Sequence, residues 1–417
     1  MNILLTGAIS LSNKGTAAII VSTITMLKKA FPYSDIFIEL FYPEKQKRII
    51  DLEKEYKANV IAPLMQYPLK GVLLFLLAFL TSLFRRFRIK SLNFKRIENY
   101  ENVDIIVDIS AEGFVIFYDE PFAQTTIRFL MHLFPILMGF LLGKPIVLLA
   151  QSLAPFGVFK PIMKYVIKKS VLVTVRDSTS IENLKKEGID TAKIYLTADL
   201  AFLLDAALND TVDAILKLEG IDLDTLREKK VIGICAGRIL KPEKHEKLIK
   251  ILANVADSLI EEYNAVIVFI PHSSGKIREE SDDVIVGMEI INHVDNKRDF
   301  YLIKGDYTPQ ELKGIIGNLD CLLSLRMHPV ISASFMRVPS IIIAFNPKAY
   351  GLMKMLELEN NVIHIDEAQN EYLLLASIVK CIKESRNIKK VLKNVIPNIQ
   401  EKALTNIIML EQILHEK

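Results

Sequence analysis

The stretch Leu319–Gly351, LDCLLSLRMHPVISASFMRVPSIIIAFNPKAYG, decides the fold that we predict for this chain. The apolar run Asp320–Leu325 predicts a buried strand, and His328–Met336 has the small and apolar pattern of a helix packed on a sheet. Pro339 then interrupts the chain before a second, β-branched strand at Ser340–Phe345. Strand, turn, helix and strand in this order form the repeating unit of a parallel sheet.

Polar residues gather at the turns of this unit. Ser324, Arg326 and His328 fall where the first strand meets the helix, and open α/β sheets bind ligands at the carboxyl ends of their strands. A helix N-terminus at that place favours anions. Asn346 and Lys348 follow the second strand in the same way, and a bound anion would explain a cation at the start of a helix. The pattern leaves open that Arg326 makes a surface ion pair and that His328 caps the helix.

Length and composition bound the class of protein. The 417 residues suit two α/β domains, and a hydrophobic content of 51% without low-complexity tracts indicates a folded globular chain. A net charge of +3 gives no support for nucleic acid as a partner. Cys235, Cys321 and Cys381 are scattered, as expected of reduced thiols in a cytosolic protein, and no metal-ligand spacing is seen. The chain starts directly with a strand, so we expect no signal peptide.

The alternation of strands and helices predicts three parts. Residues 1–207 form a first α/β domain, and the polar, charged stretch Leu208–Lys229 is predicted to be the linker at the start of the second part, residues 208–385, whose first strand is Val231–Ala236. A helical segment, residues 386–417, ends the chain.

Polar residues also follow strands elsewhere in the chain. They are Asn13 and Gly15 in the first loop, Ser110 and Glu112, Gln151, Arg176, and in the second domain Arg238 and His272. The first loop is neither a dinucleotide fingerprint nor a P-loop, so a helix cap is an equal interpretation of Asn13. For Glu112 and His272 a position in a water-facing loop stays open, and for Arg176 an ion pair with the neighbouring Asp177.

The segment Leu69–Phe84 is an apolar run that ends in the basic cluster Arg85–Lys90. Its uninterrupted apolar part is shorter than the roughly 20 residues needed to span a bilayer. Two interpretations remain: a buried helix, or a helix that lies in the membrane interface with its basic end against anionic headgroups. We favour the membrane surface. Phe129–Leu142 is also apolar, but it leads into a strand and is predicted to be a core helix.

The motifs together resemble the polysaccharide pyruvyl transferase family. That family typically has a small residue, Arg–Leu/Met–His, an apolar helix, a proline before a hydrophobic strand, and Lys–x–x–Gly. The matching positions here are Ser324, Arg326-Met327-His328, Val338-Pro339 and Lys348-Ala349-Tyr350-Gly351. Weaker matches are Asn13 with Gly15, Gln151-Ser152, Pro155-Phe156, Arg176-Asp177 and Pro271-His272.

The resemblance implies a fold and an activity. The fold would be two Rossmann-like parallel-sheet domains facing a cleft, as in GT-B glycosyltransferases, with the last helix packed back on the first domain. The activity would be pyruvyl transfer from phosphoenolpyruvate to a sugar of a cell-surface glycan or of its lipid-linked precursor. No metal and no cofactor beyond this co-substrate are implied, and the enzyme would be cytoplasmic or peripheral on the inner face of the plasma membrane.

The resemblance also assigns roles to residues. Catalysis falls to Arg326, His328 and Glu112, the last as a base for a sugar hydroxyl. The donor would be bound by Ser324, Arg326, His328, Asn346, Lys348, Arg176, Arg238 and His272. The acceptor would be bound by Asn13, Gly15, Ser110 and Gln151.

Three departures from the family pattern keep two other interpretations open. Thr16 replaces an acidic residue, and Ala111 and Ala154 replace glycines. A degenerate, non-catalytic binding protein at the membrane would tolerate these changes. A glycosyltransferase that uses a nucleotide sugar is the other alternative, since Glu359 and Glu367 have the eight-residue spacing of such enzymes, although a strand-like stretch separates them.

Overall fold

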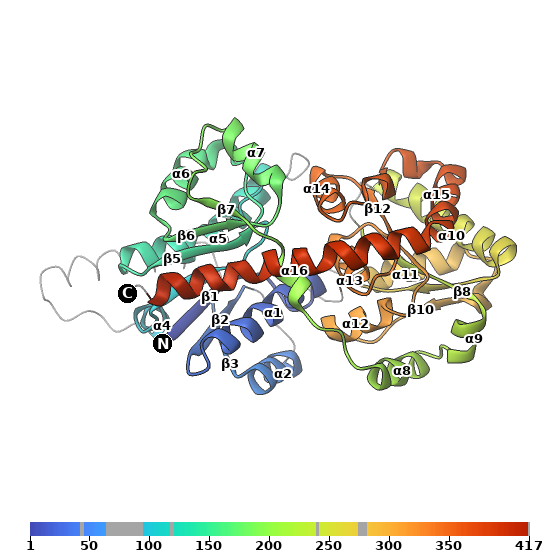
Figure 1. The fold of residues 1–417 in the computed structure, drawn as a ribbon, viewed down its shortest axis with the longest axis horizontal. Coiled ribbons are helices and arrows are strands. Elements are labelled where there is room, and N and C mark those ends of the chain that lie inside the picture. Colours follow the sequence, from blue (N-terminus) through green and yellow to red (C-terminus); the bar gives the residue numbers. More distant parts are fainter. Residues whose placement is uncertain (42–45, 64–94, 117–120, 239–241, 274–281, 416–417) are drawn as a thin grey trace, which may run out of the picture. The chain divides into compact units, whose positions relative to one another are not determined.

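The computed structural model describes the chain except for residues 42–45, 64–94, 117–120, 239–241, 274–281 and 416–417 (Figure 1). Its contacts divide the chain into two compact units. The first unit consists of Met1–Leu11, Ile19–Leu200 and Lys402–Lys417, and the second of Ser12–Ala18 and Ala201–Glu401. The helices α1 (Lys14–Ala30) and α16 (Ser385–His415) therefore each supply residues to both units.

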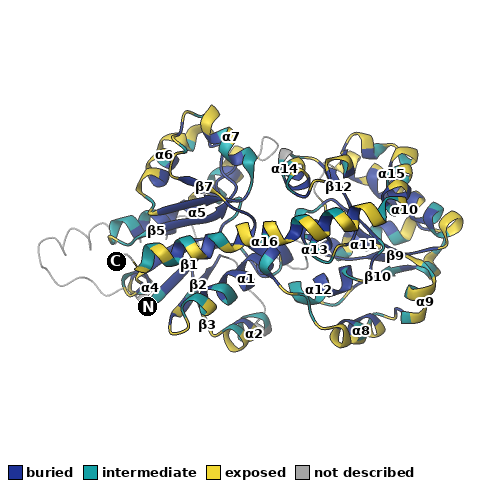
Figure 2. Ribbon diagram, viewed as in Figure 1, coloured by how far each residue is buried: buried dark blue, intermediate teal, exposed yellow. Residues whose placement is uncertain are grey.

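A seven-stranded parallel sheet forms the centre of the first unit, in the order β3-β2-β1-β4-β5-β6-β7. The strands are β1 (Asn2–Ala8), β2 (Asp35–Leu40), β3 (Ala58–Ile61), β4 (Ile105–Asp108), β5 (Ile146–Gln151), β6 (Leu172–Val175) and β7 (Ile194–Leu196). Every residue of β4, β5 and β6 is buried, as expected for a parallel sheet covered on both faces (Figure 2).

Further helices of the first unit connect the strands of this sheet. They are α2 (Gln46–Tyr56), α4 (Lys95–Glu101), α5 (Phe122–Leu141), α6 (Lys160–Lys169) and α7 (Ser178–Lys186). The long apolar helix α5 buries Phe129, Leu133 and Ile136 in the core, which confirms the predicted core helix. Of the described helices, α5 alone has the length and apolar composition of a membrane span, but 44% of its apolar window is buried in the protein. The core helices of other proteins meet the same criterion.

A six-stranded parallel sheet forms the second unit, in the order β10-β9-β8-β11-β12-β13. The strands are β8 (Lys230–Cys235), β9 (Ala265–Phe269), β10 (Phe300–Leu302), β11 (Cys321–Ser324), β12 (Ser340–Ala344) and β13 (Val362–His364). The helices between them are α8 (Asn209–Leu218), α9 (Leu223–Glu228), α10 (Pro242–Tyr263), α11 (Asp283–His293), α12 (Pro309–Ile316), α13 (Met327–Phe335), α14 (Pro347–Met355) and α15 (Glu371–Lys383). The predicted pair of parallel α/β sheets is confirmed.

The unit predicted from the quoted stretch is present as β11, α13 and β12. Each observed element lies within one or two residues of its predicted ends. Strand β11 pairs with β8 on one side and β12 on the other, so the strand order reverses between β8 and β11. Open α/β sheets bind ligands at such a point, where neighbouring loops diverge.

The C-terminal part of α16 belongs to the first unit. There Asn406, which is fully buried, accepts hydrogen bonds from the hydroxyls of Thr174 and Thr197 and donates to the carbonyl of Ala198. These bonds tie the last helix to β6 and to the segment after β7. The predicted membrane-surface segment Leu69–Lys90 lies outside the described residues.

Candidate active site

Ser324 and Arg326 shape the turn between β11 and α13. The Ser324 hydroxyl accepts a hydrogen bond from the Arg326 backbone N–H at 3.0 Å and donates to its carbonyl at 2.7 Å. Arg326 is the residue before the helix and keeps an extended backbone, with φ −115° and ψ 142°. Because the Ser324 hydroxyl makes both of these bonds to the Arg326 backbone, its role here is structural. It fixes the backbone position from which the Arg326 side chain extends.

The Arg326 guanidinium is held by Asp283, the first residue of α11. Its Nη2 lies 2.5 Å from one carboxylate oxygen, while the other oxygen accepts the backbone N–H groups of His272 and Ser273, each at 2.9 Å. Burial raises the pKa of Asp283, and the ion pair with Arg326 opposes that rise. Within the described part of the chain, Arg326 Nε has no hydrogen-bond partner. Arg326 is thus oriented by one anion and keeps a donor for a second.

Gly237, at the end of β8, leaves room for this ion pair. A Cβ atom at this position would lie 2.4 Å from Arg326 Nη2 and 2.7 Å from an Asp283 carboxylate oxygen. Any other residue would displace the guanidinium, because neither the buried carboxylate nor its backbone donors have space to move.

His272 follows β9 and is buried, so the interpretation of a surface-loop residue is wrong. Its Nδ1 lies 3.5 Å from Cys235 Sγ. Burial, with a smaller contribution from the charges of Arg326, His328 and Lys14, lowers its pKa to about 3. The imidazole is therefore neutral at physiological pH, which disfavours His272 as a proton donor.

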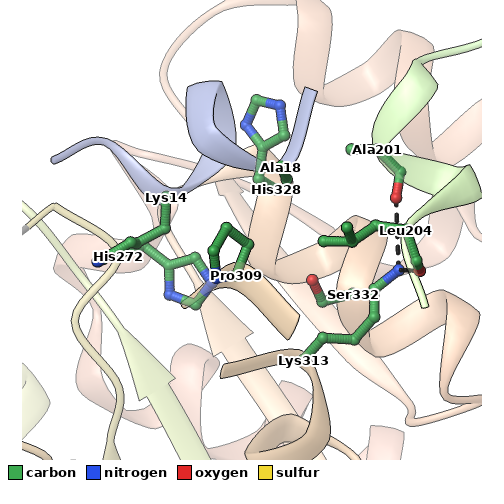
Figure 3. A pocket seen from close by; sticks show the side chains of 9 residues that line it. All are labelled: Lys14, Ala18, Ala201, Leu204, His272, Pro309, Lys313, His328 and Ser332. Atoms are coloured by element: carbon green, nitrogen blue, oxygen red, sulfur yellow. Dashed lines mark hydrogen bonds between the residues drawn. The ribbon is translucent and has the colours of Figure 1, made fainter. Parts of the chain in front are cut away.

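A narrow cavity in the second unit brings His272 and His328 together (Figure 3). The space that a water-sized group can reach is only about 10 Å³. The lining residues are Lys14, Ala18, Ala201, Leu204, His272, Pro309, Lys313, His328 and Ser332. Of the two lysines, Lys313 donates to the carbonyls of Ala201 and Leu204 at 3.3 and 2.6 Å, and Lys14 pairs with the carboxylate of Asp306.

The first loop of the chain contributes to this cavity. Gly15 lies directly against His328, since a Cβ on Gly15 would stand 2.2 Å from His328 Nδ1. Asn13 caps α1: its side-chain oxygen accepts the N–H groups of Gly15 and Thr16 at 3.0 and 3.2 Å. The cap interpretation of Asn13 is thus observed, and acceptor binding by Asn13 and Gly15 stays a prediction.

Lys14 is the cavity residue that sequence reasoning missed. Its backbone N–H donates to the His272 carbonyl at 2.9 Å, and its ammonium group pairs with Asp306 at 2.7 Å. A basic residue between a helix cap and a glycine, after the first strand of an α/β domain, was the available signal. Nothing in the spacing shows that this loop meets His272.

The remaining predicted donor residues are less central. Asn346 caps α14 by accepting the Lys348 backbone N–H at 3.1 Å, and the Lys348 side chain is partly buried at the first turn of that helix. Arg238 is more exposed and makes an ion pair with Glu289 of α11, which also bonds His245 at 2.9 Å. Donor binding by these residues stays a prediction.

In the first unit, the polar residues after β4 and β5 form a closed network around Asp108. Its carboxylate accepts from the Ser110 hydroxyl at 2.6 Å, the Ser110 backbone N–H at 3.1 Å and the Gln151 amide at 3.0 Å. Burial raises the pKa of Asp108 to about 7, against these hydrogen bonds. Ser110 and Gln151 were predicted to bind the acceptor, but in this structure their side chains serve the network, which sequence reasoning missed.

Arg176, at the end of β6, is the centre of a second buried network. Its guanidinium bonds Asp199 at 2.5 Å, Glu112 at 2.9 Å and the Ser152 hydroxyl at 3.0 Å. The neighbouring Asp177 caps α7, so the ion pairs of Arg176 are made with Asp199 and Glu112 and not with Asp177, the alternative that the sequence left open. The Glu112 carboxylate therefore contacts a buried guanidinium, and its role as the base for a sugar hydroxyl stays a prediction.

The two alanines in place of family glycines have strained backbones. Ala111 has φ +59° and Ala154 has φ +61°, in the left-handed region that glycine adopts without cost. Among the described residues, no group of three or more His, Cys, Asp or Glu is arranged to hold a metal ion.

Comparison with known proteins adds a family to this geometry. The family model described as polysaccharide pyruvyl transferase matches residues 13–347. The curated protein "Amylovoran biosynthesis protein AmsJ" of Erwinia amylovora is 24% identical over 233 residues, which are 53% of this chain. The match spans about half, 54%, of that relative's own length.

Solved structures share the fold at low identity. A glycosyltransferase from Rickettsia africae is 12% identical with a TM-score of 0.61, over 100% of this chain and 99% of its own. The UDP-GlcNAc 2-epimerase of Neisseria meningitidis, solved with UDP-GlcNAc, is 14% identical with a TM-score of 0.58, over 99% and 100%. These likenesses establish a GT-B-like α/β fold.

Proposed function

Because the chain belongs to the polysaccharide pyruvyl transferase family, we propose that it moves a pyruvyl group from phosphoenolpyruvate to a sugar of a cell-surface glycan or of its lipid-linked precursor. The product is a cyclic ketal on two sugar hydroxyls, as first inferred from the motifs. The observation that carries the proposal is the Arg326–His328 turn at the carboxyl end of β11.

The reaction sets three requirements. The methylene carbon of the donor gains a proton and becomes a methyl group, which leaves oxocarbenium character at the neighbouring carbon. That carbon forms bonds to two sugar oxygens and loses its bond to the phosphate oxygen. Of the two protons that the hydroxyls release, one balances the proton gained by carbon and the other leaves with phosphate.

Residues of the second unit suit these requirements. Arg326 keeps a donor for the carboxylate or phosphate of the donor substrate, and a guanidinium is the group that binds such anions with defined geometry. His328, two residues on, is the proton-transfer candidate because histidine titrates near neutral pH. Lys348 and the N-terminus of α13 stabilise the negative charge of the departing phosphate.

The glycosyltransferase alternative rests on fold likeness alone. Glu359 and Glu367 lie in separate short helical turns on either side of β13. The Glu367 carboxylate accepts the backbone N–H of His364 at 3.0 Å. No observed contact therefore favours this pair as a nucleotide-sugar site.

Ligand binding and turnover of two variants test the proposal. Arg326→Ala should weaken phosphoenolpyruvate binding about 10- to 100-fold, because a charge-assisted hydrogen bond contributes about 1.5–3 kcal/mol. His328→Asn should lower turnover by about 10²- to 10⁴-fold with a smaller change in donor affinity. Calorimetric titration and phosphate-release assays measure the two quantities.

Arg227→Ala is the matched control, since Arg227 makes an exposed ion pair with Asp224 on α9. It should change neither quantity. Wild-type protein that is stabilised against heat by a nucleotide sugar, and not by phosphoenolpyruvate, would replace this proposal with the glycosyltransferase. A His328→Asn variant that loses donor binding but keeps turnover at saturation would make His328 a binding residue.

A further inference from the structure

Lys14 is an unusual lysine because its whole side chain is enclosed. It is 5% exposed, although it lies at the first position of α1. Lysine is almost never buried unless its charge is paired. Its backbone is also fixed: the N–H donates to the His272 carbonyl, and Asn13 forms a β-bridge with Ser273. This bond, which is part of the bridge, fixes the Lys14 backbone beside His272.

The space beside Lys14 is selective by size. About 10 Å³ is the room of one water-sized group, far less than a sugar ring needs. One oxygen of a phosphate or carboxylate fits such a space. Lys14, His272 and His328 are among the residues that line it (Figure 3). The cavity therefore suits the anionic end of a small donor, and not the acceptor sugar that the first loop was predicted to bind.

The present partner of Lys14 can be exchanged. Asp306 lies 2.7 Å from the ammonium group and is 28% exposed, so water can solvate this carboxylate when the pair opens. Lysine carries a point charge on a flexible four-carbon stem, so its ammonium can turn from one anion to another without a fixed geometry. Nearby, Arg326 is likewise held by a carboxylate, that of Asp283.

The geometry points to Lys14 as a binding residue for an oxygen of the donor's phosphate, with Asp306 as the carboxylate that holds the ammonium group when no anion is bound. The identity of the donor rests on the proposed function; the anion site does not. The loop at residues 12–18 then serves the donor side of the reaction.

Two substitutions with opposite expected effects test this inference. Lys14→Met keeps the length of the side chain and removes its charge, so it should weaken binding of phosphoenolpyruvate and of inorganic phosphate about tenfold or more. Asp306→Asn removes the competing carboxylate and should tighten both a few-fold. A lysine with a purely structural role predicts no change in affinity from either variant, or a loss from both.

The ion pair Lys229–Asp299 is the control, because it has the same 2.7 Å separation in the same unit, while the Lys229 side chain is 28% exposed against 6% for Lys14. Lys229→Met and Asp299→Asn should leave anion affinity unchanged. Calorimetric titration gives the affinities, and thermal unfolding shows whether each variant is folded. Lys14→Arg, which keeps the charge, should retain most of the affinity if Lys14→Met itself proves unstable.

The possible results separate the two proposals. If Lys14→Met binds phosphoenolpyruvate as the wild type does, the assignment of Lys14 is overturned and the proposed function stands. If the wild type binds inorganic phosphate through Lys14 but not phosphoenolpyruvate, the anion site stands and the proposed donor is wrong. Failure of the wild type to bind either ligand overturns both.

Discussion

The two sheets place polar residues at the same topological position and use them in opposite ways. In each sheet the strand order reverses at the centre, between β1 and β4 in the first unit and between β8 and β11 in the second. In the first unit, Asp108 and Arg176 are each surrounded by partners of the protein itself. In the second, Arg326 Nε has no hydrogen-bond partner among the described residues, and the cavity lined by Lys14, His272 and His328 lies in the same unit.

This difference separates polar residues that stabilise a loop from polar residues that can bind a ligand. A buried charge whose hydrogen bonds are all made inside the protein has none to offer a substrate. A cation that is held by one carboxylate and lies beside space for another group can still bind a substrate. A polar residue at the end of a strand is therefore a candidate for ligand binding. Whether its hydrogen bonds are already made within the protein decides between a structural and a binding role.

The largest effect that we expect from this comparison is a loss of stability when Arg176 is replaced. Arg176→Met leaves the buried carboxylate of Asp199 and that of Glu112 without their counter-ion. Breaking a buried pair in this way costs about 3–5 kcal/mol of unfolding free energy. Denaturant-induced unfolding measures it. The same change at Arg227, an exposed pair on α9, should have no measurable effect.

Retained stability in Arg176→Met, together with a loss of phosphoenolpyruvate binding, would contradict the structural role. Arg176 would then return to the donor-binding role that the motif resemblance implies. A loss of stability, without a change in the affinity of the folded fraction for phosphoenolpyruvate, supports a structural role of Arg176.

Sequence reasoning reached the fold because the fold depends on local signals. Apolar runs, prolines and caps predicted β11, α13 and β12 to within one or two residues. It also found Arg326 and His328, because they follow a strand directly. Side-chain partners are not local: Arg176 meets Glu112 across 64 positions, and Lys14 meets Asp306 across 292. No spacing rule reports such contacts, so the closed network was predicted as a site and Lys14 was missed.

A smaller effect is expected from two matched glycines, each packed against a histidine ring. A Cβ on Gly15 would lie 2.2 Å from His328, and one on Gly113 would lie 2.6 Å from His132 in the first unit. Gly15→Ala should displace the His328 ring and lower turnover about 10- to 100-fold, since small misplacements of a reacting group are costly. Its stability should change little, because alanine favours the helix by about 1 kcal/mol over glycine.

Gly113→Ala should show the reverse pattern. His132 is buried among Phe41 and Phe114, and burial lowers its pKa to about 3, so it is a neutral core residue. Crowding it should cost about 1–3 kcal/mol of unfolding free energy. The folded fraction should keep its turnover. Equal losses of turnover in both variants would show that the first-unit loop also takes part in the reaction. Steady-state kinetics beside thermal unfolding distinguishes these outcomes.

The smallest difference to be measured, about 1.4 kcal/mol over one pH unit, tests the closed network itself through the pH dependence that Asp108 gives to stability. The folded pKa of about 7 lies above the ordinary value of 3.8 because burial disfavours the charged form. Between these values the folded protein holds a proton that the unfolded chain has lost, so rising pH weakens the fold. The slope is about 1.4 kcal/mol per pH unit.

Asp108→Asn removes this titration and imitates the protonated acid, since its amide can face the Thr6 hydroxyl that lies 3.3 Å from Asp108 Oδ2. The unfolding free energy of the wild type, relative to that of Asp108→Asn, should therefore fall by about 1.4 kcal/mol between pH 5 and pH 6. The difference should be constant above about pH 8, where both states are ionised. Other titrating groups cancel in the difference because both proteins share them. A difference that rises from pH 3 to pH 5 and is flat thereafter would mean that the hydrogen bonds from Ser110 and Gln151 outweigh burial. The network would then hold a permanent carboxylate.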